Sequence, residues 1–177
     1  MTPTIQGPSA SSVQLLGLGY ACATMSTEQN KIIVRRFIDE LWNRRLLDVA
    51  NEVFSTTCIT HQLRSGAEID SSPRDPESLK KHVAEWLASF PDLHFEIEQM
   101  MAEGDLVVTR CVMRGTHSVA WFGVTPTRKT ISIRMMITHR IVAGQIVEDW
   151  VLVDSLGFFQ QLGLIPATEE LMKQAAK

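Results

Sequence analysis

The hydrophobic period of this 177-residue chain changes once, near Pro91. Apolar residues recur every three or four positions before that point and every second position after it, which is typical of helices followed by strands. A helical half followed by strands with tight turns between them predicts an α+β fold, with helices packed on an antiparallel sheet. The length suits a single domain with a sizeable core.

Start and stop signals set the limits of the predicted elements. Ser26 and Gln29 form a capping-box pattern at the start of the first helix, and Asp75 with Pro76 marks the start of another. Glycine-containing turns separate the later strands. Helices are predicted over 26–45, 46–54 and 75–90, a loop over 64–74, strands over 93–101, 106–115, 130–141 and 146–153, and further helices over 157–162 and from 168 onwards.

The first 23 residues contain no charged side chain and are rich in Gly, Ser, Pro and Thr. A signal peptide is not expected there, because it needs a basic segment and the first basic residue is Lys31. We predict an N-terminal extension over 1–25, disordered or loosely packed, with Met25 as an alternative start of translation. One domain over 26–166 and a helical tail over 167–177 complete the chain.

The composition excludes several classes of function. Seventeen Lys and Arg against 20 Asp and Glu give a formal net charge of −3, and the basic residues are scattered, so neither nucleic acid nor a membrane is an expected partner. No apolar run reaches the roughly 18 residues of a membrane span. Three scattered cysteines predict neither a disulfide framework nor a zinc site, and they favour a cytoplasmic location.

Seven segments in the second half of the chain occur in a characteristic order. They are Glu103-Gly104-Asp105, Val107–Arg110, Gly115-Thr116-His117, Pro126-Thr127, Gly144–Trp150, Asp154 and Gln160–Gly163. Together they resemble the SnoaL-like polyketide cyclases of the nuclear-transport-factor-2-like superfamily, over about residues 27–165. Two positions depart from that family's pattern, since Val119 and Arg128 stand where glycine is usual.

The resemblance implies a cone-shaped α+β barrel, in which a strongly curved antiparallel sheet encloses a pocket and the N-terminal helices close its side. It also implies a cyclase or isomerase that needs no metal or organic cofactor and closes a ring in an apolar, polyketide-like small molecule by an aldol-type reaction. A homodimer or higher homo-oligomer is expected through the outer sheet face, where Val147, Val151 and Val153 offer apolar side chains.

The same resemblance places the catalytic acid/base at Asp154, four residues after Trp150. Period two puts both residues on one face of the last strand. An enclosed Asp154 would have its pKa raised towards a useful range by desolvation. The residues alone leave open that Asp154 only caps the helix that follows.

His139 is the second catalytic candidate. Arg134 and Arg140 are expected to face solvent, so His139 and Met135 take the inward face of the preceding strand. From there His139 could approach Trp150 or Asp154 and donate a hydrogen bond to an enolate oxygen. A buried core histidine is the plainer interpretation.

Further side chains are candidates for substrate binding because they offer aromatic stacking, an adaptable apolar lining or a polar group. Arg110 lies in a Val-rich strand and is expected to pair with Glu148 or Asp154. Each also has an ordinary role in packing or in a turn, and His82 and His94 are expected on solvated faces. The substrate-binding candidates are Trp150, His117, His61, Phe37, Trp121, Met135 and Arg110.

Two alternative functions stay open. An epoxide hydrolase of the same superfamily uses an Asp-Arg-Asp arrangement, to which Asp154 and Arg110 could contribute, but Asp149 is expected to face the other way. A non-catalytic small-molecule-binding or dimerisation module is the other alternative. A pocket filled by side chains, or Asp154 pointing outward as a helix cap, would favour the module.

Overall fold

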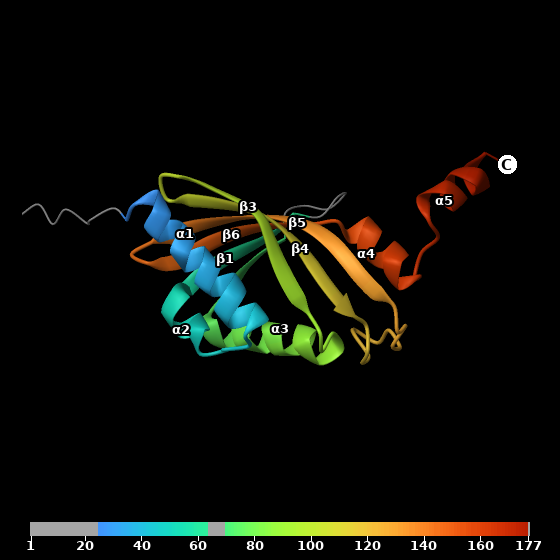
Figure 1. The fold of residues 1–177 in the computed structure, drawn as a ribbon, viewed down its shortest axis with the longest axis horizontal. Helices are drawn as coiled ribbons and strands as arrows, with labels where there is room; N and C mark the ends of the chain where they lie inside the picture. The colour runs from blue at the N-terminus through green and yellow to red at the C-terminus, as the bar shows by residue number, and fades with distance from the viewer. Residues whose placement is uncertain (1–24, 64–69, 177) are drawn as a thin grey trace, which may run out of the picture.

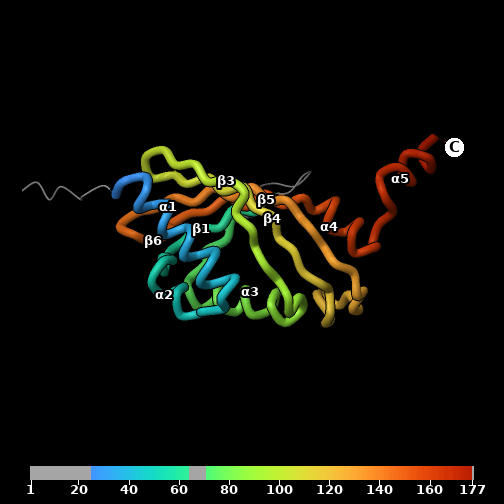
Figure 2. The backbone as a smooth tube through the Cα atoms, in the orientation of Figure 1, coloured from blue at the N-terminus to red at the C-terminus, as the bar shows by residue number. Residues whose placement is uncertain are grey.

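The computed structural model describes residues 25–63 and 70–176 of the chain. Its centre is one six-stranded sheet in the order β2-β1-β6-β5-β4-β3. The sheet is strongly bent and does not close into a barrel (Figures 1 and 2). The strands are β1 (Phe54–Leu63), β2 (Asp70–Arg74), β3 (His94–Glu103), β4 (Leu106–Thr116), β5 (Thr130–Val142) and β6 (Gln145–Val153). β1 pairs with β6 in parallel, and the other neighbouring pairs are antiparallel.

Helices cover one face of this sheet. The first three helical segments and α3 lie on the same side of it in Figure 1, while α5 projects away from the body at the C-terminus. The bounds are α1 (Thr27–Arg36), the π-helical η1 (Phe37–Asn43), α2 (Val49–Val53), α3 (Pro76–Ser89), α4 (Ser155–Leu162) and α5 (Thr168–Ala175). The predicted α+β cone is therefore confirmed. No helix among the described residues is long and apolar enough to span a membrane.

The helix starts follow the local signals in the sequence. The Ser26 hydroxyl accepts the Gln29 N–H at 3.2 Å, and the Gln29 side chain accepts the Ser26 N–H at 2.8 Å. These reciprocal bonds satisfy backbone donors that have no partner inside the helix. At the other end, the Asn43 amide group holds both the N–H and the C=O of Phe95, at 2.8 and 2.9 Å, which fastens η1 to β3.

Two strands differ from the prediction. The segment 46–54 forms only the short α2, and β1 begins immediately after it. β2 lies within the predicted loop 64–74, of which 64–69 fall outside the described residues, as does the predicted extension apart from Met25. Pro73 inside β2 is compatible with a strand because β2 is at the edge of the sheet, where a missing N–H breaks no ladder.

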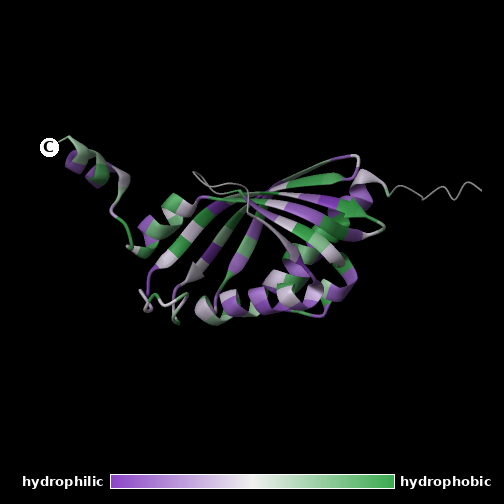
Figure 3. Ribbon diagram, turned by 180° about the vertical axis from the view of Figure 1, so that it is seen from behind, coloured by the Kyte–Doolittle hydropathy of each residue, from purple (hydrophilic) through white to green (hydrophobic). Residues whose placement is uncertain are grey.

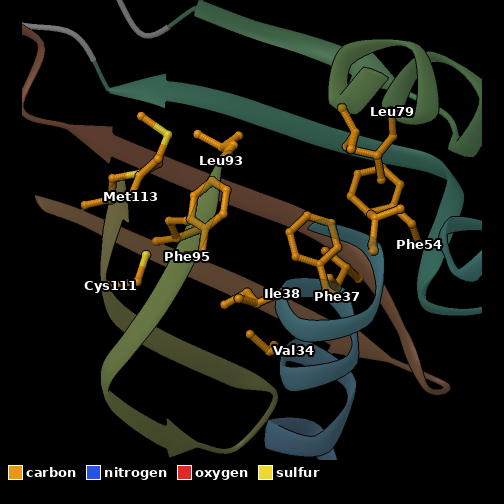
Figure 4. Packing of buried hydrophobic residues seen from close by; sticks show 14 of the residues in the cluster. Val34, Phe37, Ile38, Phe54, Leu79, Leu93, Phe95, Cys111 and Met113 are labelled. Carbon is orange, nitrogen blue, oxygen red and sulfur yellow. The ribbon is translucent and has the colours of Figure 1, made fainter. Parts of the chain in front are cut away.

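The core fills the space between the helices and the concave face of the sheet. Period two is regular in β5, where every second residue is buried (Figure 3 shows the alternating hydropathy of the strands). Figure 4 shows the helical residues Val34, Phe37 and Ile38 facing strand residues such as Phe95. Burying side chains of this size stabilises the fold by about 1.5–3 kcal/mol each.

Candidate active site

Three polar side chains lie side by side on the concave face. Thr60 of β1 is opposite Asp149 of β6, and Asp149 is opposite His139 of β5. Their exposed fractions are 1%, 5% and 0%. Polar groups so deeply buried are normally paired.

These three side chains have unused hydrogen-bonding capacity. Within the described residues, the Thr60 hydroxyl, Oδ1 of Asp149 and both ring nitrogens of His139 have no hydrogen-bond partner. A buried polar atom left without a partner costs about 1–3 kcal/mol. The row formed by Thr60, Asp149 and His139, which we call the polar row, therefore keeps unused hydrogen-bonding groups inside the core.

Burial also sets the protonation states in the polar row. It raises the pKa of the Asp149 carboxyl from 3.8 to about 6, against the opposing positive charge of Arg74. It lowers the pKa of His139 to about 3. At neutral pH, Asp149 is thus a carboxylate close to its pKa, while the His139 imidazole is uncharged and offers one donor and one acceptor.

The surroundings of the polar row are apolar. The Phe37 ring meets the His139 ring edge-on, with the centroids 5.4 Å apart. Met135 lies two residues from Ile137 on the same inward face, and both are buried. The buried Cys58 thiol, whose pKa burial raises to about 12, adds no reactive nucleophile. The structure thus brings together two predicted site residues, Phe37 and His139, whereas Met135 lies four residues further along the same face of β5.

Asp154 lies elsewhere. The residue is exposed, and its Oδ1 accepts the Gly157 N–H at 2.8 Å at the start of α4. The expectation that Asp154 is enclosed on the inner face is wrong, because the strand ends at Val153 and the free N–H groups of the following helix attract the carboxylate. The buried acid of this region is Asp149.

Trp150 and His61 lie on the outer face of the sheet. Their rings stack with centroids 5.2 Å apart, and Arg140 lies over the Trp150 ring. His61 also contacts the Ser71 hydroxyl at 2.7 Å and the Glu148 carboxylate at 2.9 Å. Neither side chain reaches the polar row. The expectation that Trp150 and His61 line an interior pocket is therefore wrong.

The faces of β6 are the reverse of those expected for it. Val151 and Val153 pack against the core on the inner side, and Leu152 is exposed on the outer side. Val151 and Val153 are therefore not available on the outer face, where they were expected to contribute to a dimer interface. Arg110 is likewise on the outer face, where it pairs with Glu98 at 3.0 Å and is half-exposed.

His117 is fully buried directly after the end of β4, near α3. Its Nδ1 accepts the Thr127 N–H at 3.2 Å, and its ring stacks on Phe90 with centroids 5.2 Å apart. Backbone bonds to Arg128 and Lys129 complete the connection. These contacts support the interpretation of His117 as a residue that fastens the turn.

Trp121 belongs to an aromatic cluster near the same end of β4. Its ring centroid lies 5.2 Å from those of Trp86 and Phe158. Trp121 and Phe122 border a hollow of about 340 Å³ between α3 and the segment after β4. The cluster is separate from the polar row, which Trp121 does not contact.

His82 was expected to be solvated and is half-buried. Its ring lies edge-on to Trp42 and Trp86, with centroids 6.1 and 6.4 Å away. Burial lowers the pKa of His82 to about 4. His82 is therefore an uncharged ring at neutral pH, packed against two tryptophans.

Comparison with known proteins identifies the family. The family model for SnoaL-like polyketide cyclases matches residues 32–162. The chain belongs to the SnoaL-like polyketide cyclase family. No curated protein matches the chain.

Solved structures of similar proteins extend this result. IdmH of Streptomyces antibioticus, a proposed polyketide cyclase, is 30% identical with a TM-score of 0.66, covering 76% of this chain and 99% of IdmH. AclR of Streptomyces galilaeus, a proposed hydroxylase, is 26% identical with a TM-score of 0.69, covering 85% and 95%. A proposed polyketide cyclase of Bacillus cereus is 27% identical with a TM-score of 0.63, covering 80% and 87%.

Within this SnoaL-like domain, the residues suggested for an epoxide hydrolase do not come together. Arg110 is engaged with Glu98 on the outer face, and Asp154 is engaged with the start of α4. In residues 25–63 and 70–176, no group of three or more His, Cys, Asp or Glu side chains is placed to hold a metal ion.

Sequence reasoning missed Asp149 and Thr60. Asp149 was assigned to the opposite face of its strand, and Thr60 lies in a strand that was not predicted. The signal for Asp149 is the pairing of β6 with β5, because a residue opposite the inward His139 must itself face inward.

Proposed function

We propose that this protein is a cofactor-independent, cyclase-type enzyme that acts on a polyketide-like ketone or ester, with Asp149 as its acid/base. The observation that supports this most is the buried Asp149 carboxyl, with its pKa raised to about 6 and one oxygen that has no hydrogen-bond partner in the described part of the chain. A base with a pKa near the working pH combines the correct protonation state with a sufficient driving force. Membership of the SnoaL-like family supports a cyclase-type reaction.

In the proposed reaction, the Asp149 carboxylate removes a proton from a carbon next to a carbonyl group. The C–H electron pair becomes the enolate, whose oxygen accepts a hydrogen bond from the uncharged His139 ring. The enolate carbon then attacks a second carbonyl carbon of the same molecule and forms a C–C bond. Protonated Asp149 returns its proton to the new alkoxide, so the product is a cyclic isomer of the substrate.

The apolar surroundings contribute in two ways. They strengthen the hydrogen bond to the enolate, because little water competes for it. They also hold a flexible substrate folded, so that its two carbonyl groups meet, which is a large part of the barrier to ring closure. Phe37, whose ring meets the His139 ring, is the predicted site residue that supplies this lining.

The proposal is tested by deuterium uptake from D₂O into the acetyl methyl group of 4-acetylbenzoate and its methyl ester, followed by NMR. Asp149→Asn should slow the enzyme-dependent exchange about 100-fold or more. Asp154→Asn makes the same chemical change at the exposed cap and should leave the rate within a few-fold. The opposite result would assign the acid/base role to Asp154, and no exchange by the unaltered enzyme would count against the proposed chemistry.

A non-catalytic binding module is the second candidate function. It is favoured by the dense packing of the concave face and by the engagement of Asp154 as a cap. A module of this kind would bind the two acetylbenzoate probes without exchanging their methyl protons. Sedimentation velocity would show whether it is also the dimer that the family resemblance leads us to expect.

A further inference from the structure

The segment between β4 and β5 contains a tight turn with an unfavourable residue at its tip. Trp121 and Val124 exchange two backbone hydrogen bonds, at 3.1 and 2.8 Å, which leaves Phe122 and Gly123 as the two central residues. Both have positive φ angles, of 45° and 81°. A two-residue turn of this kind favours Asn followed by Gly, because a bulky side chain is strained in the left-handed region. The turn itself therefore does not account for the phenylalanine.

The Phe122 side chain does not belong to the core either. It is 81% exposed, and its ring meets the Trp121 ring edge-on, with the centroids 5.0 Å apart and the ring planes at 79°. Trp121 is held in turn by Trp86 and Phe158, whose centroids are both 5.2 Å from its own. A strained backbone and an exposed aromatic side chain are features of binding sites.

The hollow of about 340 Å³ beside this turn, which we call the aromatic hollow, has two aromatic walls. They are the nearly perpendicular rings of Trp121 and Phe122. A third side is the face of α3 that carries Glu85 and, three and four residues later, two small side chains that leave the space open. The complete lining is Glu85, Ala88, Ser89, Ala120, Trp121 and Phe122.

Ser89 fastens the two sides of the aromatic hollow to each other. Its backbone C=O accepts the N–H groups of Ser118 and Val119, at 2.9 and 3.3 Å, and its hydroxyl donates to the Ala120 C=O at 3.3 Å. The aromatic hollow is therefore already formed without a ligand, which lowers the entropic cost of binding.

Glu85 is the one charged residue among those that line the aromatic hollow. It is exposed, and in the part of the chain that the structure describes its carboxylate takes part in no salt bridge. The faces of aromatic rings also carry partial negative charge. A cation that enters the aromatic hollow is thus attracted both by the carboxylate and by the two rings, whereas an anion is repelled by Glu85.

We propose that the aromatic hollow binds an organic ammonium group, of the N-methylated class, as a site separate from the polar row. The methyl groups of such a cation carry part of its positive charge, so they bind to ring faces electrostatically and are also removed from water there. The carboxylate of Glu85 balances the remaining charge. The inference does not depend on the proposed function, because no residue of the polar row lines the aromatic hollow.

NMR titration with choline chloride and with 3,3-dimethylbutan-1-ol, at equal ionic strength, tests the inference. The alcohol has the shape of choline but carries carbon in place of the charged nitrogen. Choline should bind about 10-fold more tightly than the alcohol. Glu85→Gln should weaken choline binding about 3- to 10-fold and leave the alcohol unchanged. Glu169→Gln, which removes an exposed charge from α5, should change neither.

Variants of Phe122 distinguish an aromatic contact from a merely apolar one. Phe122→Tyr should retain the preference for choline, and Phe122→Leu should lose most of it. Phe122→Asn should lose it as well, although Asn suits the turn and should leave the urea midpoint of unfolding unchanged or raise it. Such a gain in stability with a loss of binding is not expected for a purely structural residue.

Several results would overturn the proposal. These are equal binding of choline and the alcohol by the unaltered protein, equal effects of Glu85→Gln and Glu169→Gln, and full retention of the preference in Phe122→Leu. A lower urea midpoint for Phe122→Asn would instead assign Phe122 a structural role. Sedimentation velocity covers the remaining alternative, since a dimer that Phe122→Leu dissociates and choline does not would assign the aromatic hollow to a second copy of the chain.

Discussion

Replacing Asp149 by Asn should change the pH dependence of the free energy of unfolding. Burial raises the pKa of this carboxyl from 3.8 to about 6, so the folded protein binds its proton more tightly than the unfolded chain does. The stability contributed by the protonated carboxyl is present below pH 3.8 and is lost as the pH rises through about 6. The amide of the Asp149→Asn variant would remain uncharged throughout, and its contribution would not change.

The magnitude follows from the two pKa values. Their difference corresponds to ~3 kcal/mol in total, because each pKa unit is worth 1.36 kcal/mol. With Asp149 only 5% exposed, little of this is lost to solvent screening. The advantage of the Asn variant over the unaltered protein should therefore grow by more than about 2 kcal/mol between pH 4 and pH 7. Any hydrogen bond that the amide gains or loses changes the stability difference between the two proteins by the same amount at every pH, and therefore does not change its pH dependence.

Urea unfolding followed by tryptophan fluorescence, at one-unit intervals from pH 4 to pH 8, measures this difference. His139 also titrates abnormally, since burial lowers its pKa to about 3 and its contribution is lost as the pH falls below 6.5. That contribution is present in both proteins and cancels to a first approximation. Asp154→Asn is the matched control at an exposed position. A difference that stays constant across the pH range, or one that Asp154→Asn reproduces, would refute burial as the cause.

Two further predictions concern stability and reactivity. Ser26→Ala should lower the free energy of unfolding by about 1 kcal/mol through loss of the capping box, whereas Ser72→Ala on the edge strand should change it little; equal effects would contradict the capping role. In a Cys22→Ser background, Cys58 and Cys111 should react with Ellman's reagent only as the protein unfolds, because both are buried and burial raises their pKa values to about 12 and 11; prompt labelling of the folded protein would show that the core is open.

The parts of the fold that were predicted depend on short-range chemistry. The capping boxes at Ser26 and Asp75 and the tight turns around Gly104 and Gly144 involve neighbouring residues, so the sequence displays them directly. β1 and β2 lack such signals. β1 carries polar residues on both faces and is completed by a parallel partner about 90 residues away, and β2 contains Pro73 at the sheet edge. Their pairing depends on tertiary contacts that no local pattern reveals.

The candidate site was predicted in part for a related reason. His139 and Met135 were placed on the inner face because β5 alternates without interruption. The pairing of β6 with β5, in contrast, is interrupted. It begins with Val142 opposite Gln145, but one extra residue in β6 shifts the pairing between Ile141 and Arg140, so that His139 meets Asp149. A hairpin without this shift would pair His139 with Glu148 and turn Trp150 inward, as uninterrupted alternation predicts.

The bulge therefore determines which carboxyl side chain faces the interior. Asp149 and Asp154 are five residues apart, an odd number, so a continuous strand cannot direct both side chains to the same face. With the bulge, Asp149 faces the concave side beside Thr60 and His139. The chain is then free to end β6 at Val153 and to use Asp154 as a cap.

Val147 is the extra residue of this bulge, because Ile146 pairs with Ile141 and Glu148 already pairs with Arg140. Deleting Val147 should give a regular hairpin in which every later residue keeps its partner and its face. Deleting Thr138, in the uninterrupted part of β5, instead shifts one side of the strand by one residue and turns its buried side chains outward. The Thr138 deletion should therefore unfold at a much lower urea concentration than the Val147 deletion. If the two deletions are equally destabilising, Val147 is not the extra residue, and the assignment of Asp149 to the inner face through the bulge is wrong.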